Sequence, residues 1–225
     1  MCKSTLQLTI ILLCIGVLSA CDNTPPLERT TISDQARLTG TFYTESPDDL
    51  VFPVKVLFAI DCSGSMGAAG DGSDPSNRRL AAARAFVDQY NGYPNISFEI
   101  MLWNQGIYRA TQVDGDRGFT KDPGEINNVL ANVVNTGTTD YVGTIEAIHE
   151  DIARDIANVD THESLVRTKY VVLFFSDGLD NVPGVTGQRV SETLNAISDI
   201  TEMVDEEGVG DFTFNTIMLP GINMT

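Results

Sequence analysis

Two runs of almost entirely apolar residues, separated by segments of helical periodicity, constrain the fold of this chain more than any other feature. Residues 51–60 (VFPVKVLFAI) and 169–175 (KYVVLFF) show no regular alternation of polar and apolar side chains. A strand of this kind is typical of a parallel sheet that helices cover on both faces. The alternation of strands with helices therefore predicts an α/β fold with a doubly wound, mostly parallel sheet.

The expected elements follow one another along the chain as strands and helices. We expect strands at 51–60, 96–104, 106–111, 169–178 and 212–219, and helices at 77–90, 123–134, 140–159 and 190–205. With 225 residues and 42% hydrophobic content, the chain is long enough to form one good core. We assign that core to a single domain at 51–225.

The first 20 residues have the features of a secretion signal. An apolar run extends from Leu6 to Leu18, and small residues precede Cys21. The sequence Leu18-Ser19-Ala20-Cys21 resembles the bacterial lipobox, which implies cleavage before Cys21 and attachment of lipid to its sulfur. An ordinary cleaved signal is the alternative, because the same residues also fit an A-x-A-like cleavage site.

Residues 21–50 are polar and contain prolines, and we expect them to form a lipidated N-terminus and tether. A flexible coil of about 29 residues spans roughly 30 Å, which lifts a domain clear of a membrane surface. The expected location is therefore the bacterial cell envelope. The lipid at Cys21 anchors the protein to the membrane, with the domain on the periplasmic or extracellular face.

The net charge of the chain narrows the class of partner that it can bind. The formal charge is −17, and the residues after 20 hold 13 basic and 31 acidic side chains, which gives −18. Such a surface repels nucleic acid and anionic lipid headgroups. The acidity either keeps the protein soluble or favours cations, metal ions among them.

Cys62 alone stays free if Cys2 and Cys14 leave with the signal and Cys21 is lipidated, and we expect it to be buried.

Oxygen-bearing side chains stand at the ends of two expected strands and in one loop. Ligands of open α/β sheets bind at the carboxyl ends of the strands, so these side chains are candidates for a shared site. The set comprises Asp61, Ser63, Ser65, one of Thr138 and Thr139, and Asp177. Mg²⁺ prefers oxygen ligands in octahedral geometry, and two carboxylates balance its charge. The sequence therefore predicts a site for Mg²⁺ (or Mn²⁺).

Three motifs in this order, DxSxS at 61–65, GTTD at 137–140 and SDG at 176–178, resemble the von Willebrand factor type A (VWA) domain with its metal-ion-dependent adhesion site. The resemblance covers about residue 51 to the C-terminus. It implies a metal held by Asp61, Ser63, Ser65, Thr139 and Asp177. It further implies a protein partner that donates an Asp or Glu to the metal. Thr138 replaces a glycine of the family pattern, so the choice between Thr138 and Thr139 stays open.

The resemblance also implies a different C-terminal end. Members of the family usually follow a strand such as 212–219 with another strand and a closing helix, whereas only PGINMT remains here. We therefore expect the domain to be truncated or unusually short at this end. A long apolar strand edge and an uncovered sheet face would follow from that ending.

Each proposed ligand also has an ordinary structural interpretation. Asp61 and the serines could cap a helix, and Asp177-Gly178 could form a turn. Their joint occurrence at strand ends favours the metal site. We expect no enzyme but a binding module, with a metal-assisted hydrolase of phosphatase type and an accessory subunit of a larger envelope complex as alternatives. The segment 114–125 has part of the spacing of a calcium loop, yet its glycine is displaced, so a solvated acidic loop is expected.

Overall fold

Strands and helices alternate in the order that the sequence predicts. The computed structural model describes residues 52–67, 72–131, 133–178, 180–185 and 189–219, all within the second of two units, Ala36–Thr225. The expected signal, the tether and Cys21 lie outside the described residues. The elements are β1 (Val54–Asp61), α2 (Gly64–Gly67), α3 (Arg78–Tyr90), β2 (Ile96–Trp103), β3 (Ile107–Ala110), β4 (Gln112–Val113), β5 (Asp116–Arg117), α4 (Pro123–Leu130), α5 (Tyr141–Ala157), α6 (His162–Leu165), β6 (Lys169–Ser176), α7 (Val190–Glu206) and β7 (Asp211–Met218).

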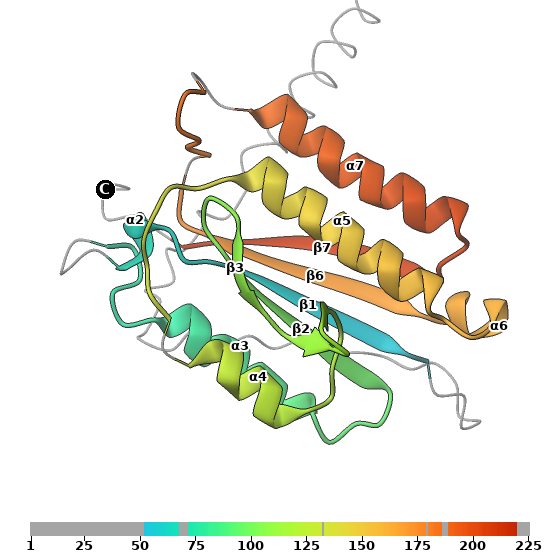
Figure 1. Cartoon of the computed structure of the whole chain (residues 1–225). Coiled ribbons are helices and arrows are strands. Elements are labelled where there is room, and N and C mark those ends of the chain that lie inside the picture. The colour runs from blue at the N-terminus through green and yellow to red at the C-terminus, as the bar shows by residue number, and fades with distance from the viewer. Residues whose placement is uncertain (1–51, 68–71, 132, 179, 186–188, 220–225) are drawn as a thin grey trace, which may run out of the picture. The chain divides into compact units, whose positions relative to one another are not determined.

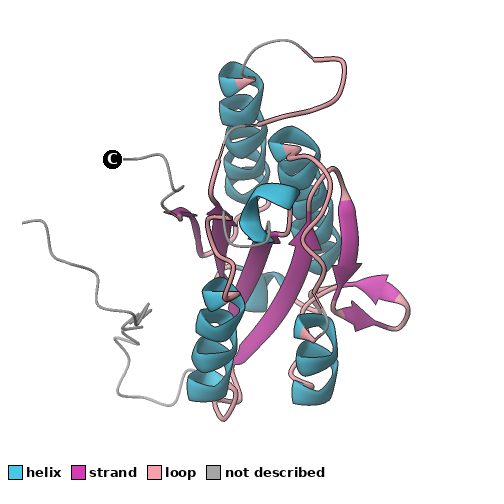
Figure 2. Cartoon of the chain, turned by 90° about the vertical axis from the view of Figure 1, so that its left-hand side faces the viewer, coloured by secondary structure: helices cyan, strands magenta, loops and turns pink. Residues whose placement is uncertain are grey.

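The described residues form a five-stranded sheet in the order β3-β2-β1-β6-β7. β1 pairs in parallel with β2 and β6, and β7 pairs in parallel with β6, while β3 runs antiparallel to β2. The carboxyl ends of the four parallel strands therefore meet at one edge of the sheet. This edge lies on the left of Figure 1 and faces the viewer in Figure 2. The predicted α/β fold with a doubly wound, mostly parallel sheet is confirmed.

Helices cover both faces of the sheet, which explains why β1 is apolar at almost every position (Figure 1). Phe58 packs in the core cluster with residues of α3 and α4, and its ring meets that of Phe86 edge-on at 5.4 Å. Leu57 and Ala59 point to the other face, where they join residues of α5 and α7. Because both faces are buried, alternation between polar and apolar residues is absent from this strand.

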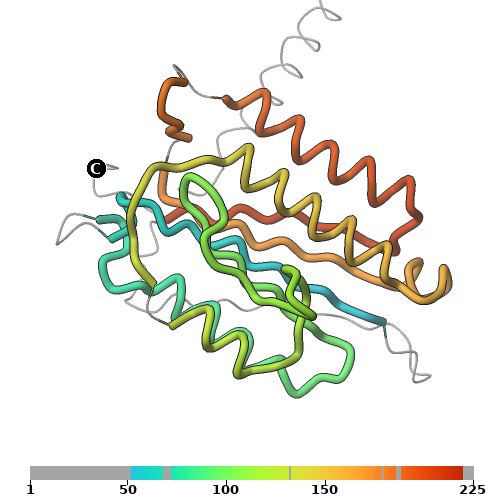
Figure 3. Tube along the Cα trace, in the orientation of Figure 1, coloured from blue at the N-terminus to red at the C-terminus, as the bar shows by residue number. Residues whose placement is uncertain are grey.

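The ends of helices α4 and α5 position the loops at the edge of the sheet where the parallel strands end. Asp140 precedes α5, and its Oδ1 accepts a hydrogen bond from the N–H of Gly143 at 3.1 Å. Helix α4 ends at Leu130, four residues earlier than expected, because Ala131 adopts an extended conformation. The chain then runs back past the end of β1 before it enters α5, as Figure 3 shows. This path brings the GTTD motif to the strand ends.

Two short features differ from the sequence expectation. The segment expected to be a solvated acidic loop begins with a hairpin in which β4 pairs with β5. Asp114 and Gly115 connect these strands with φ angles of 53° and 94°, the left-handed conformations that a two-residue hairpin turn requires. The helix α6 was not expected either. Its N-cap Thr161 accepts a hydrogen bond from the N–H of Ser164, which starts a short helical turn.

Strand β7 forms one edge of the described sheet. Phe212 and Phe214 are half-buried against the cluster of α5 and α7, whereas Thr213 and Asn215 are exposed on the opposite face. This face of the strand is therefore uncovered, as expected, and the side chains that it exposes at Thr213 and Asn215 are polar. None of the helices in the described ranges has the length and hydrophobicity needed to cross a bilayer.

Candidate metal centre

The end of β1 folds into a tight turn that gathers oxygen atoms. Asp61 is the last residue of the strand, and its Oδ1 accepts a hydrogen bond from the N–H of Ser63 at 2.7 Å. A carboxylate that binds the backbone two residues on stabilises such a turn. The short helix α2 follows at once and carries Ser65. Asp61 and Ser63 are both fully buried, so these oxygens face the interior of the site and not bulk water.

Four of the five predicted ligands are joined in one hydrogen-bond network. The Ser63 and Ser65 hydroxyl oxygens lie 3.0 Å apart, and the Ser65 hydroxyl donates to Asp177 Oδ1 at 2.9 Å. Ser176, at the end of β6, donates from its hydroxyl to Asp61 Oδ2 at 2.7 Å. The ends of β1 and β6 therefore place Asp61, Ser63, Ser65 and Asp177 together, as the sequence predicts.

The fifth predicted ligand lies in the adjoining loop without such a side-chain bond. Thr139 is buried, and its backbone exchanges two hydrogen bonds with Asn181, at 3.1 and 2.7 Å. Among the described residues, no hydrogen bond joins its hydroxyl to the other four ligands. The Thr138 hydroxyl is buried and has no hydrogen-bond partner there. The loop itself contacts the β1 turn, because the N–H of Gly64 donates to the carbonyl of Gly137 at 3.1 Å.

The electrostatics of the site favour a cation. Burial raises the pKa of Asp61, and the nearby charge of Asp177 adds to this, while hydrogen bonds from Ser63 and Ser176 oppose it. No ion pair within the described ranges involves either carboxylate. Two carboxylates held close together without a basic partner repel each other, and a divalent cation relieves that repulsion.

The oxygen spacing also fits a small octahedral ion. Mg²⁺ binds oxygen at about 2.0–2.1 Å, so neighbouring ligands of an octahedron lie about 3.0 Å apart. The two measured spacings along Ser63, Ser65 and Asp177 are 3.0 and 2.9 Å. The same spacing suits the hydrogen bonds that satisfy these oxygens here. The described part of the chain contains no group of three or more His, Cys, Asp or Glu that could hold a metal, so a metal at this site would need serine or threonine hydroxyls as ligands.

Three further side chains lie at the site, and sequence reasoning missed their roles: Ser73 and Ser176 contact proposed ligands, and Tyr141 contacts Ser176. The Ser73 hydroxyl donates a hydrogen bond to Asp177 Oδ2. The Tyr141 hydroxyl shares a hydrogen bond with Ser176 Oγ at 2.7 Å, and burial raises the pKa of Tyr141 to about 12. Ser176 was visible as part of the SDG motif. Nothing in the sequence around Ser73 or Tyr141 signalled that they reach the site, because their contacts span long stretches of chain.

A buried arginine supports the turn from behind. Arg79 lies on α3, is 1% exposed and forms an ion pair with Asp74 at 2.8 Å. Its Nε donates to the main-chain carbonyl of Asp61 at 2.8 Å. Asp74 also accepts the N–H groups of Arg78 and Arg79, at 2.7 and 3.0 Å, and so takes the place of a side-chain cap for α3. An arginine in a helical pattern usually indicates a solvated face, so the sequence did not predict this role.

The free cysteine lies beside this arginine in the buried interior. Cys62 is fully buried, as expected, and burial raises the pKa of its thiol although Arg79 lies close to it. A thiol that stays protonated does not attack substrates.

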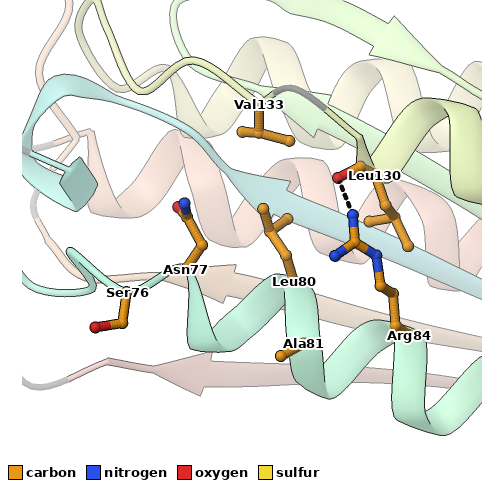
Figure 4. A pocket seen from close by; sticks show the side chains of 7 residues that line it. All are labelled: Ser76, Asn77, Leu80, Ala81, Arg84, Leu130 and Val133. Carbon is orange, nitrogen blue, oxygen red and sulfur yellow. Dashed lines mark hydrogen bonds between the residues drawn. The ribbon is translucent and has the colours of Figure 1, made fainter.

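A separate pocket of about 340 Å³ lies between α3 and the end of α4 (Figure 4). Leu80, Leu130 and Val133 give it an apolar floor, and Arg84 Nη2 donates across it to the carbonyl of Leu130 at 2.5 Å. Ser76, Asn77 and Ala81 complete the lining. It contains none of the five predicted ligands and is therefore distinct from the candidate metal centre.

Comparisons with known proteins find the fold in solved structures only. No protein-family model and no curated protein match the chain. The PilB minor pilin from Streptococcus sanguinis aligns with a TM-score of 0.51 and 13% identity over 80% of this chain and 53% of that chain. The manganese-loaded TRAP protein of Plasmodium vivax gives 0.49 and 14%, over 76% and 59%. The vWF domain of the type V pili tip protein Mfa5 from Porphyromonas gingivalis gives 0.42 and 20%, over 61% and 43%.

The chain spans less than two thirds of the length of each of these solved proteins. At 13% identity, the likeness to PilB, with its TM-score of 0.51, shows a shared fold and nothing further. The α/β fold expected from the motif resemblance is therefore one that this chain shares with PilB.

Proposed function

We propose that this chain is a lipid-anchored protein of the bacterial envelope whose VWA domain binds a protein partner through a divalent metal. The metal is Mg²⁺ or Mn²⁺, held by Asp61, Ser63, Ser65, Thr139 and Asp177. The partner donates an Asp or Glu to it. The minor pilin PilB, which shares this fold, supports a role outside the cytoplasm.

The observation that carries the proposal is the chain of oxygens from Ser63 through Ser65 to Asp177, with Asp61 buried beside it. These atoms lie at the spacing of octahedral neighbours and include two carboxylates without a basic partner among the described residues. When bound, the metal supplies a positive centre that attracts an anionic oxygen. The hydroxyls stay neutral and so leave part of the ion's charge available to that oxygen.

Charge also defines what the partner has to overcome. Beyond residue 20 the chain carries a formal charge of −18, so an incoming carboxylate meets general repulsion. The metal is then the local attractive point. Added salt weakens both the repulsion and the attraction, so it changes the affinity little.

Binding is favoured over catalysis because the site lacks the groups that hydrolysis needs. Asp61, Ser63 and Asp177 are tied to one another or to Ser176, and no lysine, arginine or histidine pairs with either carboxylate within the described ranges. A phosphatase requires an activated nucleophile or water and cationic support for the leaving group. Hydrolysis of nitrophenyl phosphate with Mg²⁺ by the purified chain would overturn this choice.

The first test is metal binding by the full chain in detergent, measured by isothermal titration calorimetry with Mg²⁺ and Mn²⁺. We expect binding in the wild type and none in Asp61→Ala. Thr138→Val and Thr139→Val show which threonine binds the metal. Removal of the true ligand lowers the affinity for the metal, whereas the other substitution leaves that affinity unchanged. Wild-type protein that binds neither metal would contradict the proposal.

The second test is capture of a partner from envelope extract, with Mg²⁺, with EDTA and with Asp61→Ala. Binding in Mg²⁺ alone supports metal-dependent recognition. Equal capture in all three conditions would show constitutive assembly, as expected of an accessory subunit. Substitution of single Asp or Glu residues of the captured protein then identifies the donated carboxylate.

Lipid anchoring is tested separately at Cys21. The wild-type chain should incorporate labelled palmitate in a bacterial host, and Cys21→Ser should not. Continued labelling of Cys21→Ser would exclude this residue as the attachment site.

A further inference from the structure

A single arginine connects the two loops that carry the proposed ligands Thr139 and Asp177. Arg189 directly precedes α7 and is half-buried. Its Nε donates to Asp180 Oδ2 at 2.6 Å, and its Nη2 donates to Asp180 Oδ1 at 2.7 Å. The same Nη2 donates to Asp140 Oδ1 at 2.6 Å. Asp140 follows Thr139 in the chain, and Asp180 lies three residues after Asp177.

The backbones of the two loops are also joined by hydrogen bonds. Thr139 and Asn181 exchange two backbone hydrogen bonds, and the N–H of Tyr141 donates to Asp180 Oδ1 at 2.9 Å. Arg189 therefore adds a side-chain link between two loops that are already joined by these hydrogen bonds. Arg189 also offsets the repulsion between the carboxylates of Asp140 and Asp180, because its Nη2 contacts both of them.

We propose that Arg189 is a positioning residue that fixes the Thr139 loop against the Asp177 loop and thereby makes the site selective for small divalent cations. This inference rests on the proposed metal site. Mg²⁺ demands near-ideal octahedral geometry at about 2.0–2.1 Å, whereas Ca²⁺ accepts six to eight oxygens at 2.3–2.6 Å in flexible arrangements. Loops held in one register favour the small ion. Loosened loops lose affinity for Mg²⁺ more than for Ca²⁺.

Arginine suits this role better than lysine. The planar guanidinium presents several N–H donors in fixed directions, so one side chain can hold one carboxylate through two donors and reach a second one. A lysine keeps the positive charge but offers a single point of contact. Arg189→Lys therefore separates geometry from charge, which Arg189→Gln alone cannot do.

The experiment measures the affinity of the full chain in detergent for Mg²⁺, Mn²⁺ and Ca²⁺ by calorimetry, in wild type, Arg189→Lys and Arg189→Gln. We expect both variants to bind Mg²⁺ and Mn²⁺ about 10-fold more weakly, as is usual when a residue that orients metal ligands is lost. The loss for Ca²⁺ should be smaller, so the ratio of Mg²⁺ to Ca²⁺ affinity falls. Arg167, an exposed arginine paired with Glu163 at 2.6 Å, provides matched controls in Arg167→Lys and Arg167→Gln, which should match the wild type.

A charge effect gives the opposite pattern and would overturn the inference. In that case Arg189→Lys binds metals as the wild type does, and Arg189→Gln binds every cation more tightly because a positive charge has been removed. Wild-type affinities and an unchanged ratio in both variants would overturn it as well.

A second readout needs no metal and separates this inference from the proposed function. Amide hydrogen exchange of Thr139 and Asn181, followed by NMR in EDTA, should be faster in both Arg189 variants than in the wild type and the Arg167 controls. Unchanged exchange would contradict the positioning role. If the wild type binds no metal, the proposed function fails, while the exchange rates still decide whether Arg189 holds the two loops together.

Discussion

The Ser65 hydroxyl donates to Asp177 Oδ1 at 2.9 Å, although 112 residues separate the two in the chain. This bond joins the turn after β1 to the end of β6. It exists because β1 and β6 are parallel neighbours, so their carboxyl ends lie side by side. Removal of charge from this junction has a measurable consequence.

Asp61→Asn should stabilise the protein in EDTA and abolish stabilisation by Mg²⁺. The substituted amide still offers an oxygen to the N–H of Ser63, while a fully buried charge near Asp177 disappears. Without metal, we expect the free energy of unfolding to rise by about 1 kcal/mol. This corresponds to relief of a pKa shift of less than about one unit. Thermal unfolding with EDTA and with Mg²⁺ measures both effects, with the exposed Asp160→Asn as the control. A lower melting temperature than the wild type in EDTA would contradict the prediction.

We expect Glu99 to make the stability of the fold depend on pH. This side chain lies within β2, is fully buried and is close to the carboxyl group of Asp151. Burial raises its pKa well above the ordinary value, and Asp151 and Asp155 raise it further, while Arg117 opposes the shift. The neutral form is therefore the one that the core accommodates.

The direction of the pH effect follows from this shift. A carboxyl group with a raised pKa in the folded state contributes its full stability below the unfolded pKa, about 4.3, and that contribution is lost as pH rises through the folded pKa. Glu99→Gln removes the ionisation and should raise stability at pH 7.5 by about 1–2 kcal/mol. Urea unfolding from pH 5 to 8 should show a smaller decline for Glu99→Gln than for the wild type. The exposed Glu202→Gln should keep the wild-type slope, and an equal slope in Glu99→Gln would refute the assignment.

Arg79→Ala should destabilise the protein by about 3–5 kcal/mol, because it leaves the buried Asp74 without its cation. The carbonyl of Asp61 loses a hydrogen bond at the same time. Urea unfolding in EDTA measures the change independently of metal. Arg167→Ala, which breaks an exposed pair with Glu163, should cost less than about 1 kcal/mol. A similar small cost for Arg79→Ala would show that the buried pair does not stabilise the fold.

Gly210→Ala tests how closely the main chain around Val166 and Thr168 approaches the residue that precedes β7. A Cβ atom at this position would lie 2.4 Å from the carbonyl oxygen of Val166 and 3.0 Å from that of Thr168, both on the main chain. We expect a loss of about 1–3 kcal/mol or more, since backbone cannot move aside as a side chain can. Gly92→Ala, where nothing lies within 4 Å, is the matched control and should be neutral in thermal unfolding. Equal melting temperatures for the two variants would contradict the close approach.

The sequence by itself determined the fold class, because burial on both faces removes the alternation from a strand and leaves a continuous apolar run. It also predicted that Asp61, Ser63, Ser65 and Asp177 come together, since local turns and parallel strands dictate where strand ends lie. The ligand assignment itself stays a prediction. The hairpin at β4 and β5 escaped notice because its two-residue strands are too short to show a period, although Asp114-Gly115 is a typical turn pair.

Only the tertiary structure decided how the charges are compensated. Asp74 and Arg79 are five residues apart and form a buried ion pair, whereas Asp180 and Arg189 are nine apart and form a part-buried one. Neither spacing indicates such a pair in the sequence. Glu99 looks like a solvated residue in the sequence and lies in the core, where its neighbours Asp151 and Asp155 are also acidic. The physical reason is that periodicity records which side of an element faces the core. Whether a charge on that side meets an opposite charge depends on side chains that folding brings from other elements.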